Sequence, residues 1–93
     1  MEISHVKTGD AKASFKAKDG DKEIGRMDYT EAGNDKIIIE HTEVDEAHQG
    51  EGLGHDLLME VVSYAREKGI KIVPLCPFAK SVFEKEPELN DVL

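Results

Sequence analysis

Gln49-Gly50-Glu51-Gly52-Leu53-Gly54 divides this chain into a half patterned like strands and a half patterned like helices. Glycines at alternate positions allow a tight turn and leave the backbone N–H groups clear of side chains. The segment that follows has helical spacing, so the loop stands at a helix N-terminus. The first N–H groups of a helix have no partner, and the helix dipole is positive at that end. The pattern therefore predicts an anion-binding pocket at the loop.

The glycine loop does not match the two phosphate-binding motifs that are most easily recognised. A dinucleotide fingerprint has another glycine spacing and a later acidic residue, and a P-loop has Lys-Ser or Lys-Thr after its last glycine. A turn with only a structural role is the plainer alternative. If the loop binds a ligand, its pattern favours a diphosphate held by backbone N–H groups.

Before the loop, apolar and polar residues alternate, which is typical of half-buried strands. Asp19-Gly20 is a strong hairpin signal, and Gly33-Asn34-Asp35 predicts a second turn. Gly25 is a candidate bulge, and Ile37-Ile38-Ile39 predicts burial on both faces of its strand. The expected strands of this antiparallel meander are Glu2–Lys7, Lys12–Lys18, Glu23–Thr30 and Lys36–Val44.

After the loop the pattern changes to helices around one short strand. Apolar residues first recur at helical spacing, and a glycine follows where a helix would end. A proline then suits the first turn of a second helix, and another proline ends it. The expected elements are a helix from Leu53 to Gly69, a strand Ile70–Leu75 and a helix between Pro77 and Pro87, before a tail without a clear signal.

A strand, a helix and a strand in this order predict two parallel strands with a right-handed crossover. Pro74 has no N–H group, so the second of these strands should be unpaired on one side there. Ligands of such sheets bind beyond the carboxyl ends of the strands, where the glycine loop and Cys76 both fall. The sequence therefore predicts one α/β (α+β) domain over residues 1–93, with a mostly antiparallel sheet and a β-α-β-α C-terminal half.

The composition excludes several classes of protein and partner. The chain has 93 residues and a formal net charge of −8, which argues against nucleic-acid binding and suits cationic partners such as amines. A single cysteine excludes an internal disulfide, no apolar run reaches the ~20 residues of a membrane helix, and no His or Cys spacing indicates a metal site. The N-terminus is unlike a secretory signal. We therefore expect a cytoplasmic monomer or weak dimer without membrane contacts.

Four separated segments resemble the GCN5-related N-acetyltransferase (GNAT) family in their order and spacing. Val44 followed by Gln49-x-x-Gly52-x-Gly54 and an amphipathic helix resembles the acyl-CoA-binding signature of that family. His41-Thr42-Glu43-Val44 and Cys76-Pro77-Phe78 resemble the corresponding segments of a minimal branch. The resemblance covers residues 20 to 90, roughly, and implies a minimal GNAT-like fold with a splayed strand pair.

The resemblance implies acetyl-CoA as the cosubstrate, with its diphosphate on the glycine loop and its pantetheine arm between the splayed strands. Glu46 and Glu51 flank the expected diphosphate, and His48 and His55 are among the few cations nearby. Backbone N–H groups and the helix dipole would therefore supply most of the binding. The cofactor-binding residues implied in this way are Thr42, Glu43, Val44, Gln49, Gly50, Glu51, Gly52, Leu53, Gly54, His55, Lys80 and Phe83.

Cys76 and His41 are the candidate catalytic residues. If Pro77 opens a helix, the Cys76 thiol lies at a helix N-terminus, which favours the thiolate form. A buried cysteine that only fills space is the alternative. Strand pairing could place His41 beside Cys76 as a nucleophile–base pair, or His41 could be an ordinary surface histidine. The resemblance favours the catalytic role for both residues.

The function implied by the resemblance is transfer of an acetyl group from acetyl-CoA to an amine of a protein or a small molecule. The amine could attack the thioester directly, with His41 or Glu43 as the base, or Cys76 could carry the acetyl group first. Two other classes stay open, namely a non-catalytic CoA-binding or regulatory module and a small interaction domain without a ligand. The sequence does not identify the acceptor.

Overall fold

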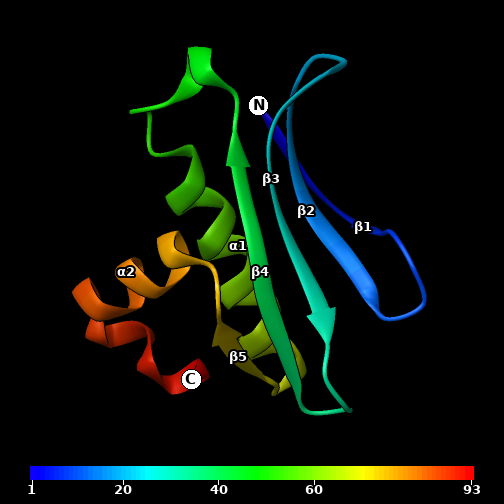
Figure 1. The fold of residues 1–93 in the computed structure, drawn as a ribbon, viewed down its shortest axis with the longest axis vertical. Helices are drawn as coiled ribbons and strands as arrows, with labels where there is room; N and C mark the ends of the chain where they lie inside the picture. Colours follow the sequence, from blue (N-terminus) through cyan, green and yellow to red (C-terminus); the bar gives the residue numbers. More distant parts are fainter.

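Five strands form one sheet in the order β1-β2-β3-β4-β5, and the two helices come from the second half of the chain (Figure 1). The computed structural model describes residues 1–93. Neighbouring strands are antiparallel except β4 and β5, which are parallel, so the predicted meander and strand–helix–strand unit are confirmed. The elements are β1 (Glu2–Lys7), β2 (Lys12–Asp19), β3 (Lys22–Glu31), β4 (Lys36–Val44), the 3₁₀ turn η1 (Glu46–His48), α1 (Leu53–Lys68), β5 (Lys71–Pro74), α2 (Pro77–Lys85) and the 3₁₀ turn η2 (Pro87–Val92).

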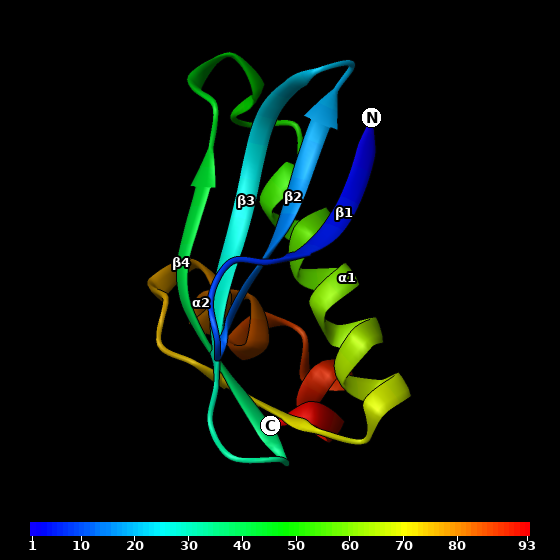
Figure 2. The same cartoon turned by 90° about the vertical axis from the view of Figure 1, so that its right-hand side faces the viewer.

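The helices cover one face of the sheet and leave the other face open. Figure 2 shows α1 running along one side of the strands. A single cluster of 21 buried hydrophobic side chains fills the space between the sheet, α1, α2 and η2. Ile37 and Ile39 of β4 belong to this core, whereas Ile38 on the open face is only half-buried. The sequence predicts burial on both faces of this part of β4. In the structure the side chains are fully buried on the helix side and only half-buried on the open face.

An extra residue in β4 reverses which of its side chains face the helices. The pairing with β3 shifts between Ile39 and His41, so Glu40 has no partner. Simple alternation from the buried Ile39 would turn His41 toward the helices. Because of this bulge, Thr42 faces the helices instead, opposite the fully buried Met27. His41 therefore lies on the open face of the sheet.

A second bulge lies in β3, next to the glycine at which the sequence predicts one. Ala17 of β2 pairs with Gly25, whereas Lys18 pairs with Glu23, which leaves Ile24 as the extra residue. A bulge is therefore present next to Gly25, with Ile24 as the extra residue, and it lies where β3 begins to pass beneath α1.

The parallel strands β4 and β5 separate before β4 ends. Their pairing stops at Ile39 and Pro74, after which the N–H groups of Leu75 and Cys76 both donate to the Ile39 carbonyl oxygen at 3.0 Å. Pro74 has no N–H group that would extend the pairing. The last residues of β4, up to Val44, therefore have no strand partner on this side, and the predicted splayed pair is confirmed (Figure 1).

The tail after Pro87, for which the sequence predicts no structure, is part of the core. It forms η2, in which Leu89 and Val92 are buried against the helices. Arg66 of α1 holds the turn by donating to both carboxylate oxygens of Asp91, at 2.9 and 2.8 Å. None of the helices in the fold combines the length and the apolar character that crossing a bilayer requires.

Candidate active site

The glycine loop opens α1 in a conformation that suits glycine. Gly50 has a φ of +85° and Gly52 has a φ of +80°, values that place both residues in the left-handed region. Gly52 is the N-cap of α1, and no side chain forms a capping hydrogen bond there. The first helical hydrogen bond runs from the Asp56 N–H to the Gly52 carbonyl at 3.0 Å. The backbone N–H groups before Asp56 therefore have no partner within the helix.

These N–H groups lie at a cleft of about 460 Å³ between β4, the loop and the two helices. Eight of the twelve predicted cofactor-binding residues line it. Gln49 also supports the cleft from within, because its side-chain amide donates to the Val44 carbonyl at 3.4 Å. The predicted residues in the lining are Thr42, Val44, Gln49, Gly50, Gly52, Leu53, Gly54 and His55.

The other four predicted residues do not line the cleft. Glu43 points to the open face, where it contacts His41, and Glu51 pairs with His48. Lys80 is exposed on α2 and forms no ion pair within 4.0 Å, whereas Phe83 is buried in the core. The resemblance implies Phe83 as a cofactor-binding residue, but Phe83 belongs to the apolar side of α2 and packs in the core.

Two residues absent from the predicted cofactor set complete the lining, namely His48 and Phe78. The Phe78 ring packs so closely on the start of α1 that a Cβ at Gly54 would lie 2.9 Å from its Cζ atom. Phe78 belongs to the Cys-x-Phe segment, so the sequence contained a signal for it. The sequence indicates His48 only as a nearby cation, because the position of η1 at the cleft follows from the tertiary structure.

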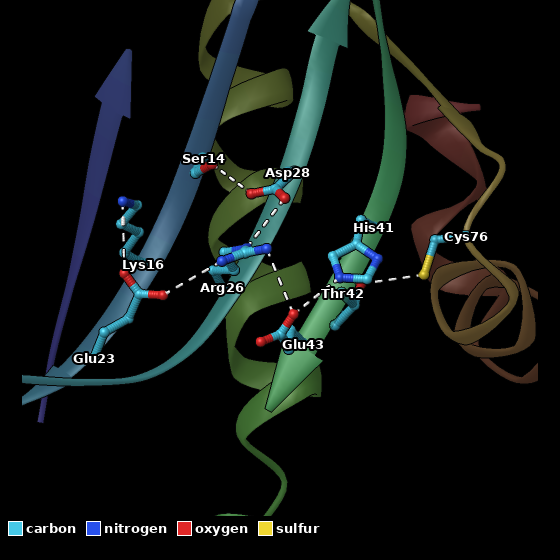
Figure 3. Close-up of polar contacts among 9 residues, drawn as sticks. All are labelled: Ser14, Lys16, Glu23, Arg26, Asp28, His41, Thr42, Glu43 and Cys76. Atoms are coloured by element: carbon cyan, nitrogen blue, oxygen red, sulfur yellow. Dashed lines mark hydrogen bonds and ion pairs between the residues drawn. The ribbon is translucent and has the colours of Figure 1, made fainter. Parts of the chain in front are cut away.

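Cys76 does not line the cleft but lies beside it, where β4 and β5 separate. It is the N-cap of α2, as predicted from Pro77, and its side chain is buried. The thiol Sγ donates to the hydroxyl Oγ1 of Thr42 at 3.2 Å (Figure 3). The bulge in β4 makes this contact possible, because it turns Thr42 toward the helices.

His41 does not form the predicted pair with Cys76. Its Nε2 contacts Glu43 Oε2 at 3.2 Å on the open face, and no hydrogen bond joins it to the thiol (Figure 3). The prediction of a direct pair depends on both residues lying near the carboxyl ends of parallel neighbouring strands, which does not decide the side of β4 that His41 occupies. The bulge at Glu40 moves His41 to the other side of the strand, so the thiol and the imidazole belong to opposite faces of the sheet.

A profile described as GCN5-related N-acetyl-transferase matches residues 14–92, which is most of the chain. The chain belongs to the GCN5-related N-acetyltransferase family. This confirms the resemblance to that family. No curated protein sequence matched the chain.

Solved structures of GNAT proteins share this fold. The solution structure of a GCN5-like candidate N-acetyltransferase from Staphylococcus aureus is 36% identical, with a TM-score of 0.71 over 98% of this chain and 85% of that one. A GNAT family acetyltransferase from Elizabethkingia anophelis with acetyl-CoA bound is 22% identical, with a TM-score of 0.66 over 81% of this chain and 52% of that one. The ribosomal-protein-S18-alanine N-acetyltransferase from Escherichia coli is 17% identical, with a TM-score of 0.70 over 84% of this chain and 53% of that one. This GNAT chain thus spans about half the length of the two larger proteins.

The open face of the GNAT sheet carries a connected set of charged side chains beside His41. Arg26 contacts Asp28 at 3.2 Å, Glu43 at 3.4 Å and Glu23 at 3.9 Å, so one guanidinium joins three carboxylates (Figure 3). Ser14, which is buried, donates to Asp28. Arg26 in this set contacts Glu43, which in turn contacts His41, and Lys16 pairs with Glu23 at 3.5 Å (Figure 3).

Proposed function

We propose that this chain transfers the acetyl group of acetyl-CoA to an amine. The diphosphate of the cosubstrate would be held by the N–H groups of the glycine loop at the start of α1, with the pantetheine arm along the cleft. The observation that carries this proposal is one cleft lined both by the glycine loop, whose N–H groups at the start of α1 have no helical partner, and by Thr42, which contacts the Cys76 thiol.

The residues present fit such a cosubstrate. Gly50 and Gly52 leave open space around their Cα atoms, so an anion can approach their backbone closely. Val44, Leu53 and Phe78 line the cleft with apolar surface, which suits the aliphatic part of a pantetheine arm. The sequence identity with the Staphylococcus aureus protein extends over nearly the whole chain and supports the same assignment.

Acetyl-CoA supplies an acetyl group activated as a thioester. The side chains near the point where β4 and β5 separate can accept and donate the protons of the transfer. In the direct route the amine nitrogen forms a bond to the acetyl carbon, and the bond from that carbon to sulfur breaks. The pair His41 and Glu43 on the open face would accept the proton of the amine, and Cys76 or water would protonate the departing thiolate. The amine would then approach from the open face, opposite to the cleft.

In the covalent route Cys76 takes the acetyl group first. Its sulfur forms a bond to the acetyl carbon, its proton goes to the departing thiolate, and the amine later displaces the cysteine sulfur. Thr42 is positioned to orient the thiol in either route, because its hydroxyl accepts a hydrogen bond from Cys76 Sγ.

Intact mass after mixing with acetyl-CoA distinguishes the two routes. An acetyl adduct on the wild type that is absent from Cys76→Ser would support the covalent route. No adduct, together with unchanged turnover in Cys76→Ser, would remove it. Turnover that falls in His41→Gln while CoA binding persists would support the base assignment.

A non-catalytic CoA-binding or regulatory module is the second candidate. The separation of His41 from Cys76 favours it, because the two proposed catalytic groups do not contact each other. Thiol release from acetyl-CoA across a panel of amines tests this alternative. Stoichiometric CoA binding without turnover on any amine would favour the module, and turnover that depends on an amine would exclude it.

A further inference from the structure

The cleft that we assign to coenzyme A contains no lysine and no arginine. Its only side chains that can become positively charged are His48 and His55. This is unusual for a site that would hold a diphosphate, in a chain whose formal net charge is −8. Backbone N–H groups carry only partial charges, so the two imidazoles are the sole full charges that the lining can offer.

Each imidazole is held at the cleft by a carboxylate outside the lining. His48 Nδ1 contacts Glu51 Oε1 at 2.9 Å, and His55 Nε2 contacts Glu86 Oε2 at 2.7 Å. The first histidine ends η1 and the second lies in the first turn of α1, so they come from the two segments that the glycine loop joins. The Glu partners fix the rings and compensate part of any positive charge on them.

We propose that His48 and His55 take up protons when coenzyme A binds and serve as the cationic partners of its diphosphate. This inference rests on the proposed function of the cleft. Imidazole is the side chain whose charge changes between pH 5 and 8, so an arriving dianion favours the protonated form in that range. An imidazolium beside a carboxylate and a phosphate is stabilised by both.

Other charged groups near the histidines do not replace them. Glu46 shares η1 with His48, and Asp56 follows His55 on α1, so both add negative charge. From the facing helix, Lys80 forms no ion pair within 4.0 Å and does not line the cleft, while Glu86 is already the partner of His55. The net surroundings of the two histidines are therefore acidic, and neither lysine nor arginine lines the cleft in their place.

Proton uptake on binding makes the affinity for CoA depend on pH. A complex that takes up protons forms more readily at low pH, so the affinity for CoA should fall as the pH rises from 6 to 8. Each proton taken up on binding corresponds to a tenfold loss of affinity per unit of pH, so the slope of log affinity against pH measures the number of protons.

Calorimetric titration with dephospho-CoA tests the proposal. This probe keeps the diphosphate but lacks the phosphate monoester of CoA, which would itself titrate near pH 6. Titrations at pH 7 in two buffers with different ionisation enthalpies give the number of protons taken up. We expect uptake with the wild type and none with pantetheine, which has no diphosphate.

The double variant His48→Gln/His55→Gln identifies the groups that receive the protons. Proton uptake and the pH dependence of affinity should both disappear in this variant. Binding should stay stoichiometric but with a lower affinity than that of the wild type. His5→Gln is the matched control, because it removes a histidine far from the cleft and should leave the uptake unchanged. Circular dichroism spectra that match the wild type would show that each variant is folded.

Two outcomes would overturn the inference without touching the proposed function. Stoichiometric binding with equal apparent enthalpies in both buffers would show that no proton is taken up. If protons were still taken up on binding in the double variant, groups other than His48 and His55 would receive them. Absence of any heat with either CoA or dephospho-CoA would instead contradict the proposed function itself, and the inference would fall with it.

Discussion

A Cβ atom added to Gly54 would lie 2.9 Å from Cζ and 3.1 Å from Cε2 of the Phe78 ring. This approach joins the first turn of α1 to the first turn of α2, and both residues line the cleft. The ring is 37% exposed, so it can yield toward the cleft rather than into the core. The size of the residue at position 54 therefore controls the space available to a ligand.

Gly54→Ala should reduce CoA binding more than stability. Overpacking of this kind costs about 1–3 kcal/mol. If the Phe78 ring moves into the cleft to relieve it, the ligand must push the ring back on binding. The affinity for CoA should therefore fall about fivefold or more. Helix propensity gains up to about 1 kcal/mol from the alanine, so the melting temperature should change little. Calorimetry with CoA and thermal unfolding measure the two effects.

The background Phe78→Leu provides the control for this substitution. The shorter side chain leaves room for the new methyl group, so Gly54→Ala should weaken binding less there than in the wild type. Equal losses in both backgrounds would show that the ring does not mediate the effect.

Gly52→Ala should damage both stability and CoA binding. The residue has a φ of +80°, and a left-handed conformation costs an L-residue about 1–2 kcal/mol. A shift of the loop to relieve this strain would turn the first N–H groups of α1 away from the ligand. Loss of one hydrogen bond to a charged group corresponds to about tenfold in affinity or more.

Gly20→Ala separates strain from ligand binding. Gly20 has a φ of +64° in the hairpin between β2 and β3, with open space around it, and it is not a cleft residue. It should lose a similar amount of stability in denaturant titrations and bind CoA like the wild type. If Gly52→Ala bound CoA as well as Gly20→Ala does, the loop amides would not hold the ligand.

The strands, the two helices and the cleft loop could be predicted because each has a local pattern. Alternation marks the strands, glycines mark the loop, and Pro77 marks the start of α2. The relation of Cys76 to β4 could not be predicted in the same way. It depends on one bulge at Glu40, and nothing in the local sequence shows that the alternation of β4 reverses there.

The C-terminal turn shows the same limit. Leu89 and Val92 of η2 are apolar residues in a polar stretch, and only their contacts with α1 and α2 reveal that they are core residues. The Arg66–Asp91 pair that closes this turn joins residues 25 positions apart. Long-range contacts of this kind have no local signature, so the sequence of the tail predicts no structure.

Leu89→Ala should therefore destabilise the fold markedly. Leu89 is 2% exposed, and removing a buried leucine side chain of this kind costs about 2–5 kcal/mol. The exposed neighbour Glu88 offers the control, because Glu88→Ala should change stability by no more than about 0.5 kcal/mol. Denaturant titrations of both variants measure the difference, and equal midpoints would contradict the placement of η2 in the core.

An aromatic group surrounds His5 on β1, the edge strand of the sheet. His5 of β1 stacks on Phe15 with ring centroids 4.1 Å apart, and its Nε2 contacts the Tyr29 hydroxyl at 2.6 Å. Tyr64 of α1 packs edge-on against the same imidazole, with centroids 4.6 Å apart. Burial in this group lowers the pKa of His5, although the carboxylate of Glu31 acts in the opposite direction.

His5→Phe should remove part of the acid sensitivity of the fold. Because the pKa of His5 is lower in the folded chain than the usual 6.5, the unfolded chain takes up the proton first as the pH falls. Wild-type stability should therefore decrease as the pH drops below about 6.5 toward the folded pKa. The phenylalanine keeps the stacking on Phe15 but cannot be protonated, so its unfolding free energy should fall less between pH 7 and pH 5. Urea titrations at both pH values measure this, and parallel losses in wild type and variant would show that His5 carries no linked proton.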